Sequence, residues 1–350
     1  MDFRYSESQT AVRDLAKQVF SRLPSAPEHV REVWRELGRS QLLGVALPEQ
    51  VGGSDSGVVA LCLVLQQAGR SASLAPLIPS LVLAAMPLAQ HAAARERLQR
   101  VCDGQSILCG ALGTSFLVRK EGSHYVLSGS QGCIEALPLA DAIVVAAREE
   151  SGGRQIFILD PHARGVTVQQ QQVASGCAIG SLTLSDVKLD AGALLEDQAD
   201  ALQDSTLDLA YLAQCAYDLG VCETALELTA RYAGERQQFG RAIGTFQAVT
   251  QRIADMHVAL ETMRLTQQRA AWLAERDLDT PETRQAIAVA RTIATQASHQ
   301  IVCAAQHIHG GMGFAREYPL HRYFLAAKQN ELQLGGHSFH LSRLGRLLST

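Results

Sequence analysis

The spacing of apolar residues changes twice along this chain, and each change marks a change of architecture. In residues 1–104 apolar side chains recur every three or four positions, which is the helical pattern. In residues 105–197 they form short runs separated by Gly, Asp, Pro and Ser, which is typical of β-strands. Residues 198–350 return to long helical patterns. The sequence therefore predicts an α+β fold with an N-terminal helical domain, a middle β-barrel or sandwich and a C-terminal four-helix bundle.

Local signals place the start of two helices. Ser6, with Gln9 three residues later, fits a capping box. Thr280 followed by Pro281 combines a capping residue with proline at the first helical position. Further helices are expected at about residues 29–40, 58–67, 81–90, 94–101, 205–231, 244–275, 280–307, 319–333 and 337–348. Strands are expected at residues 107–109, 125–127, 142–145, 156–158, 166–168 and 182–184.

Composition and charge exclude several classes of protein. The net charge of -4 and the pI near 6.3 give no reason to expect nucleic acid or an anionic membrane as partner. The N-terminal residues MDFRYSESQT lack the apolar core of a secretory leader, and the apolar runs are too short to span a bilayer. The eight cysteines include no C-x-x-C pair, so we expect buried thiols and no metal site. We expect a cytoplasmic protein.

One stretch, Arg231 to Asp255, reads RYAGERQQFGRAIGTFQAVTQRIAD. Gly240 and Gly244 relax the backbone where one helix stops and the next begins. Arg236 offers a planar fork of five donors that suits a phosphate, and Phe239 offers a flat apolar face beside it. This pair would match an aromatic cofactor that carries a pyrophosphate. An ordinary corner between two helices is the alternative.

The segment R-x-Q-F-G-x-x-I-G-x-F-Q closely resembles the flavin-binding corner of the acyl-CoA dehydrogenase family. The segments MDFRYSESQTAVRDLA and LLGVALPEQVGG resemble that family's amino-terminal helical domain, and the order of the three domains matches from end to end. The resemblance implies an FAD enzyme that desaturates an acyl-CoA thioester. A carboxylate removes a proton from the α carbon, and the flavin receives a hydride from the β carbon.

The resemblance assigns two groups of residues to the cofactor. Arg236, Gln238 and Phe239 match positions that reach the diphosphate and adenine end of FAD, and Phe246 and Gln247 match the next pair.

The second group lies in AAQHIHGGMGFAREYPLHRYF, which resembles the family segment Q-x-x-G-G-x-G. Gly310 and Gly311 would let the backbone approach a phosphate. His307 takes the usual glutamine position and Gln306 precedes it, so both are candidates for that contact. In the family, both motifs reach the flavin bound mainly by the neighbouring subunit.

The middle domain departs from the family pattern at the flavin ring. A T-E-P…G-S-D loop normally covers the ring, whereas here residues 111–117 pass almost directly into residues 118–121. In a strand of the K-x-W-I-T type, Cys133 replaces the aromatic residue and Glu135 replaces the threonine. We therefore expect no intact flavin-ring pocket within this chain's own β domain.

The positions of the catalytic base depart as well. The Y-E-G-T motif that carries the glutamate base aligns with Leu334, and the alternative base position aligns with Ala210. Asp208 matches an acid that contacts the pantetheine arm of acyl-CoA, but Tyr211 replaces the arginine expected three residues later. Candidate replacement bases are Asp218, Glu331 and His337, each of which is also interpretable as a solvated surface group or helix cap.

The leading hypothesis is that this chain is one half of a heteromeric acyl-CoA dehydrogenase, a heterotetramer with a catalytic sister chain. The chain keeps the two motifs that reach the FAD of the neighbouring subunit. It lacks the flavin-ring loop and the catalytic base that its own active site would need. Such pairs resemble those that act on steroid side-chain CoA esters, and the family commonly passes electrons to an electron-transferring flavoprotein. The alternatives are a homomeric dimer or tetramer with a relocated base, and a flavin-free scaffold of the same fold.

Overall fold

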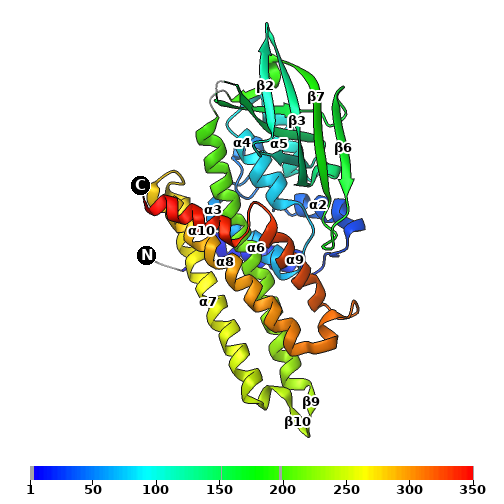
Figure 1. The fold of residues 1–350 in the computed structure, drawn as a ribbon, viewed down its shortest axis with the longest axis vertical. Helices are drawn as coiled ribbons and strands as arrows, with labels where there is room; N and C mark the ends of the chain where they lie inside the picture. The colour runs from blue at the N-terminus through cyan, green and yellow to red at the C-terminus, as the bar shows by residue number, and fades with distance from the viewer. Residues whose placement is uncertain (1–3, 151, 197–198, 350) are drawn as a thin grey trace. The chain divides into compact units, whose positions relative to one another are not determined.

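The computed structural model describes residues 4–150, 152–196 and 199–349 (Figure 1). The chain divides into two compact units. The bundle unit comprises Met1–Ser25, Val58–Ser73 and Tyr211–Thr350, and the sheet unit comprises Ala26–Gly57 and Leu74–Ala210. The division into three domains at residues 104 and 197 stays a prediction.

The sheet unit is built on one eight-stranded sheet in the order β6-β7-β3-β2-β4-β5-β8, with β1 paired to β4. Only the β1–β4 and β2–β4 pairs are parallel. The path is open, so the described strands do not close the barrel that was one of the two predicted forms. The strands are β1 (Leu108–Ala111), β2 (Phe116–Glu121), β3 (His124–Glu135), β4 (Ala142–Glu149), β5 (Arg154–Leu159), β6 (Val166–Gln171), β7 (Ile179–Asp190) and β8 (Leu194–Glu196).

The six predicted strands are present, but β2 and β8 were not predicted. The residues of β2, FLVRKE, are buried only at Phe116 and Val118 and end in three exposed charged residues. That charged half hides the alternation that marks a half-buried strand. Inside the sheet unit, Tyr125 and Phe157 meet edge to face with ring centroids 5.2 Å apart.

Helices of the sheet unit pack on this core through backbone and side-chain contacts. They are α2 (Val30–Arg39), α5 (Arg95–Cys102) and a π-helical segment (Ile78–Ala85) that leads into the short α4 (Met86–Leu88). The fully buried Trp34 donates its indole N–H to the carbonyl oxygen of Ser106 at 2.9 Å. The predicted helix at 81–90 is thus mostly a π-helix that starts earlier, at Ile78.

The bundle unit contains long helices, of which α7 and α8 run side by side in Figure 1. Its helices are α1 (Glu7–Phe20), α3 (Gly57–Arg70), α7 (Gln247–Arg276), α8 (Pro281–His309), α9 (Leu320–Leu332) and α10 (His337–Leu348), together with the second part of α6 (Asp200–Glu235). Both predicted helix starts are confirmed: Ser6 Oγ accepts from Gln9 N at 3.1 Å, and Thr280 Oγ1 accepts from Thr283 N at 3.1 Å. No helix in the described ranges is long and apolar enough to cross a bilayer.

Helices α3 and α6 touch at two glycines. A Cβ atom on Gly220 of α6 would lie 1.9 Å from the carbonyl oxygen of Gln66, and one on Gly69 of α3 would lie 2.0 Å from that of Tyr217. Beside this crossing, Glu223 accepts from Gln66 at 2.7 Å, from Arg70 at 2.9 Å and from Arg264 at 2.6 Å. The crossing is therefore held by close backbone contact and by one shared carboxylate.

We predict that Gly220→Ala lowers the free energy of unfolding by about 1–3 kcal/mol, because the new methyl group meets backbone that cannot move aside. The matched control is Gly234→Ala on the same helix, where a Cβ meets nothing within 4 Å. That control is expected to stabilise the protein by about 0.5–1 kcal/mol. Urea unfolding of the two variants checks both values, and a Gly220→Ala protein as stable as the parent would contradict the close crossing.

Candidate functional site

The corner that follows α6 is a tight β-hairpin. Strand β9 (Gln237–Gln238) pairs antiparallel with β10 (Arg241–Ala242), and the two residues between them are Phe239 and Gly240. Both have left-handed backbones, with φ of 54° and 80°. Such a pair fits a type I′ turn, but the conformation is uncommon for phenylalanine. The hairpin therefore holds an aromatic residue at its tip against its backbone preference.

This tip presents aromatic and cationic groups to solvent. Phe239 is 93% exposed, and its ring lies edge-on to Phe246 with centroids 6.2 Å apart. The guanidinium carbon of Arg241 lies 4.2 Å from the Phe246 ring centroid. Arg236, Gln238 and Gln247 are all exposed as well. Within the described residues, the Arg236 guanidinium has no ion-pair partner.

A second corner follows α8. Gly310 has φ of 58° and ψ of -134°, and with Gly311 it opens a 3₁₀ helix, Gly310–Phe314. A Cβ on either glycine would meet nothing within 4 Å, so the surface over them is open. Gln306 turns back to donate its Nε2 to the carbonyl oxygen of Gly313 at 3.3 Å, whereas His307 is exposed.

Tyr232 and His309 join the two corners. Their rings stack with centroids 4.3 Å apart at an angle of 22°. His309 is buried, donates from Nδ1 to the Ala305 carbonyl at 2.8 Å and accepts at Nε2 from the Tyr318 hydroxyl at 3.1 Å. Burial lowers the pKa of His309, which keeps the ring neutral as this bonding requires. The two predicted cofactor motifs, 236–247 and 306–311, therefore lie at the same end of the bundle unit.

In the sheet unit, the side chain of Gln131 packs against the short link between β1 and β2, where the sequence lacks the family's loop. A Cβ on Gly113, in the short link between β1 and β2, would lie 2.2 Å from Gln131 Oε1. The Gln131 side chain therefore covers this link. Further along β3, Cys133 is exposed with φ of 56° and donates its N–H to Gln171 Oε1 at 2.9 Å. Burial raises the pKa of the Glu135 carboxyl to about 7.

Neither of the two positions at which the sequence resemblance predicts a base carries a titratable group. Leu334 lies in the turn between α9 and α10 with φ of 56°, and Ala210 is fully buried in α6. Asp208 and Tyr211, the predicted substrate contacts, are buried on α6 with 2% and 6% exposure.

Hydrogen bonds from α6 and α8 hold the turn that carries Leu334 and the adjoining end of α9. Gln214 Nε2 donates to the carbonyl oxygen of Gln333 at 3.1 Å, and Asn330 Nδ2 donates to that of Gln214 at 3.2 Å. Arg291 donates to the Asn330 carbonyl at 2.6 Å and pairs with Asp218 at 2.9 Å. A turn held in this way keeps one geometry.

The three candidate replacement bases all have partners. Asp218 is 1% exposed and its ion-pair partner Arg291 is fully buried, so Asp218 is not the solvated group that the sequence suggested. Burial raises the pKa of Asp218 to about 6 despite the attraction of Arg291. Glu331 pairs with Lys328 and His299. His337 Nδ1 lies 3.2 Å from both Thr292 O and Thr295 Oγ1.

His340 is a buried polar residue to which the sequence assigns no functional role. It is fully buried on α10, and neither ring nitrogen has a hydrogen-bond partner in the described chain. Its ring meets Tyr211 edge to face at 4.8 Å, and Arg343 lies over the Tyr211 ring at 5.1 Å. Burial, with Arg291 and Arg343 nearby, lowers the pKa of His340 from 6.5 to about 3. His337 and His340 are three residues apart and could share a helical face, but no carboxylate or cysteine beside them in the sequence completes a metal-ligand set.

The thiols are all free, and most are buried. Cys133 is exposed, contrary to the expectation of buried thiols, because it sits on the irregular stretch of β3 opposite β7. In the part of the chain that the structure describes, no group of three His, Cys, Asp or Glu residues is arranged to hold a metal ion.

Comparison with known proteins decides the family. Residues 6–105 match the model of the acyl-CoA dehydrogenase N-terminal domain, and residues 201–348 match that of the acyl-CoA dehydrogenase C-terminal domain. The chain is 34% identical to acyl-CoA dehydrogenase FadE27 of Mycobacterium tuberculosis, over 100% of this chain and 99% of that protein. This chain belongs to the acyl-CoA dehydrogenase family. The resemblance stated from the sequence is confirmed, and FAD is the cofactor of this family.

Two solved structures share the fold closely. One is the ChsE4-ChsE5 complex from Mycobacterium tuberculosis, with a TM-score of 0.92 and 32% identity over 100% of this chain and 99% of that one. The other is a G363A variant described as the Tcur3481-Tcur3483 steroid ACAD, with a TM-score of 0.88 and 35% identity over 98% of each chain. The predicted α+β architecture of helices, sheet and helical bundle is confirmed.

We predict that His340→Leu makes stability less sensitive to acid. The pKa of His340 is about 3 in the folded state and 6.5 in the unfolded chain, so between these pH values only the unfolded chain is protonated at His340. The parent protein therefore loses stability as the pH falls through that window. The leucine variant lacks this loss. Melting temperatures from pH 7.5 down to about 4.5 test the difference; parallel curves for the two proteins would contradict it. Groups such as His309 and Asp218 titrate in both proteins and cancel in the comparison.

Proposed function

We propose that this acyl-CoA dehydrogenase chain acts as a subunit of a heteromeric enzyme and lends its two-corner surface to an FAD seated mainly in a catalytic sister chain. The observation that carries the proposal is the joining of both cofactor corners through Tyr232 and His309 at 4.3 Å, in a chain whose base positions hold Leu334 and Ala210. The two corners offered to a neighbour are joined by this ring stack. The positions at which a base is expected hold leucine and alanine.

The residues of the two corners suit the diphosphate and adenine end of FAD. Arg236 supplies a planar fork of donors, and Phe239 supplies an exposed apolar face beside it. The open surface over Gly310 and Gly311 allows close approach of a phosphate. The remaining proposed contacts are Gln238, Phe246, Gln247, Gln306 and His307. When bound, FAD accepts the hydride that leaves the β carbon of the acyl-CoA.

The sheet unit does not suit the ring of a flavin. Gln131 covers the link at Gly113, and Glu135 places a buried carboxyl where a hydroxyl donor is expected. With a pKa of about 7 this carboxyl is partly ionised at neutral pH, and its ionised form would repel electron density on a reduced ring and offers no donor. Both features favour a flavin ring held by the sister chain.

The acyl-CoA substrate is proposed to contact Asp208 and Tyr211 on α6. Steroid side-chain CoA esters are the proposed substrate class, supported by the likeness to a protein described as a steroid ACAD. A heterotetramer is the proposed assembly, supported by the likeness to a chain of the ChsE4-ChsE5 complex. An electron-transferring flavoprotein is the proposed acceptor, as the family resemblance implies. We place the assembled enzyme in the cytoplasm.

The proposal predicts a specific distribution of flavin. The chain purified alone is expected to carry only traces of FAD and to show no turnover, because it holds one end of the cofactor. Purified with the dehydrogenase encoded beside it, the pair is expected to be yellow and active. Absorbance spectra and protein quantitation measure flavin per chain. Full flavin occupancy with turnover by this chain alone would favour a homomeric enzyme with a relocated base, and a colourless complex would favour a scaffold.

Within the complex, Arg236→Ala is expected to weaken FAD binding by about 10–100-fold, the loss that follows removal of a charged hydrogen bond of about 1.5–3 kcal/mol. Arg252→Ala is the matched control, since Arg252 is also exposed but lies beyond the hairpin on α7. Flavin release on dilution provides the measurement, and the melting temperature of the chain alone should not change. Equal retention of flavin by both variants would remove Arg236 from the cofactor site.

A further inference from the structure

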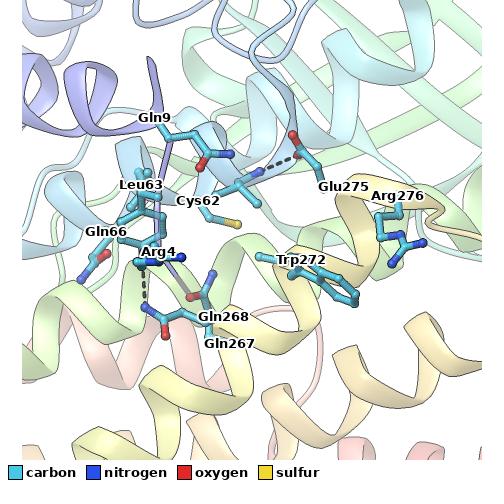
Figure 2. Close-up of a pocket in the computed structure, with 13 residues that line it drawn as sticks. Arg4, Gln9, Cys62, Leu63, Gln66, Gln267, Gln268, Trp272, Glu275 and Arg276 are labelled. Carbon is cyan, nitrogen blue, oxygen red and sulfur yellow. Dashed lines mark hydrogen bonds between the residues drawn. The ribbon is translucent and has the colours of Figure 1, made fainter. Parts of the chain in front are cut away.

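A partly open cavity of about 140 Å³ is lined by residues of the bundle unit (Figure 2), and none of these residues belongs to either corner. It is bounded by the N-terminal segment, by α3 and by the last turns of α7. Its floor is buried and mostly apolar, made by Cys62, Leu63 and Ala271. Nothing in the proposed reaction uses it.

The cavity has two chemically different ends. Glu275 accepts from the backbone N–H of Val59 at 2.9 Å, and Tyr5 accepts from Gln268 Nε2 at 2.8 Å. Residues 268 and 275 are two helical turns apart on α7, so these contacts mark opposite ends. Figure 2 shows the flat ring of Trp272 next to Arg276, whose guanidinium carbon lies 4.8 Å from the ring centroid. The end at Tyr5 and Gln268 is thus amide-rich, and the end at Trp272, Glu275 and Arg276 is aromatic and charged.

The amide-rich end offers both kinds of hydrogen-bonding group. Gln66 Nε2 donates to Glu223 and Gln268 Nε2 donates to Tyr5, which leaves the amide oxygen of each without a partner among the described residues. The Tyr5 hydroxyl accepts from Gln268 and keeps its own hydrogen to donate. Burial raises the pKa of Tyr5, so this hydrogen is present at neutral pH. A matching ligand group must accept from a hydroxyl and donate to amide oxygens.

We propose that this cavity binds a small neutral molecule with one aromatic ring and a carboxamide or comparable donor-and-acceptor group. The ring lies over Leu63 and Ala271 toward Trp272, and the polar group meets Tyr5, Gln66 and Gln268. The volume accommodates the ring, since a cavity of roughly 150 Å³ holds benzene, and the cavity is partly open, which leaves room for the polar group. A carboxylate would be attracted by Arg4 but has no hydrogen to give to the amide oxygens of Gln66 and Gln268, so benzoate is the comparison compound that tests the need for a donor.

Benzamide is the test ligand, with toluene and benzoate as comparison compounds. The chain has two tryptophans, and Trp34 is buried in the sheet unit, so a ligand in this cavity changes the emission of Trp272 alone. We expect a saturable change with benzamide at lower concentration than with toluene or benzoate, and ligand-observed NMR checks binding independently of fluorescence. Absence of binding by all three compounds, or equal binding by toluene, would overturn the proposal.

Ala271→Leu fills the floor of the cavity and is expected to abolish benzamide binding without lowering the melting temperature. Ala254→Leu, on an exposed position of the same helix, is the matched control and should bind as the parent does. If Ala271→Leu binds benzamide unchanged, the ligand lies elsewhere and the proposal fails.

Tyr5→Phe tests the polar end separately and guards against a misfolded Ala271→Leu protein. Removing the hydroxyl is expected to weaken benzamide binding about three- to tenfold, the cost of one hydrogen bond, and to leave toluene binding unchanged. Equal effects on both compounds would contradict the assigned orientation. None of these outcomes depends on flavin or on the sister chain, so they stand apart from the proposed function.

Discussion

The buried ion pair between Asp218 and Arg291 is the constraint on which the bundle unit depends most. Arg291 is fully buried. Its guanidinium donates hydrogen bonds to both the Asp218 carboxylate and the Asn330 carbonyl. Dehydrating two charges costs several kcal/mol for each ion, so the pair is stable only with such extra hydrogen bonds in place. It ties α6, α8 and α9 together at one point.

The same pair explains why the turn at Leu334 is so well held in a chain without an acid there. Gln214, Asn330 and Arg291 form a continuous set of hydrogen bonds to the end of α9. Displacing the turn would leave Arg291 with a lost partner in a site that water does not reach, which is costly. The packing around this turn is therefore kept although position 334 holds a leucine, which cannot accept a proton.

Local signals in the sequence predicted much of the fold, and contacts between distant residues were missed. The caps at Ser6 and Thr280, and the bounds of α10 at His337–Leu348, depend on neighbours a few residues away, so the sequence could place them. Asp218 and Arg291 are 73 residues apart, and no spacing pattern connects them. The stacking of Tyr232 on His309 is also nonlocal, over 77 positions. The cofactor motifs were predicted separately, and only the fold brings them to one end.

The exposed ring of Phe239 at the hairpin tip affects the solubility of copies of this chain that have no partner. A ring that is 93% exposed and held in a left-handed turn cannot fold back to hide itself. Each copy without a partner therefore exposes this apolar ring at one corner and Phe314, which is 71% exposed, at the second corner. Surplus copies would associate with one another and leave solution. For the heteromer proposed above, balanced synthesis of the two chains would then be required by surface chemistry, apart from any need of catalysis.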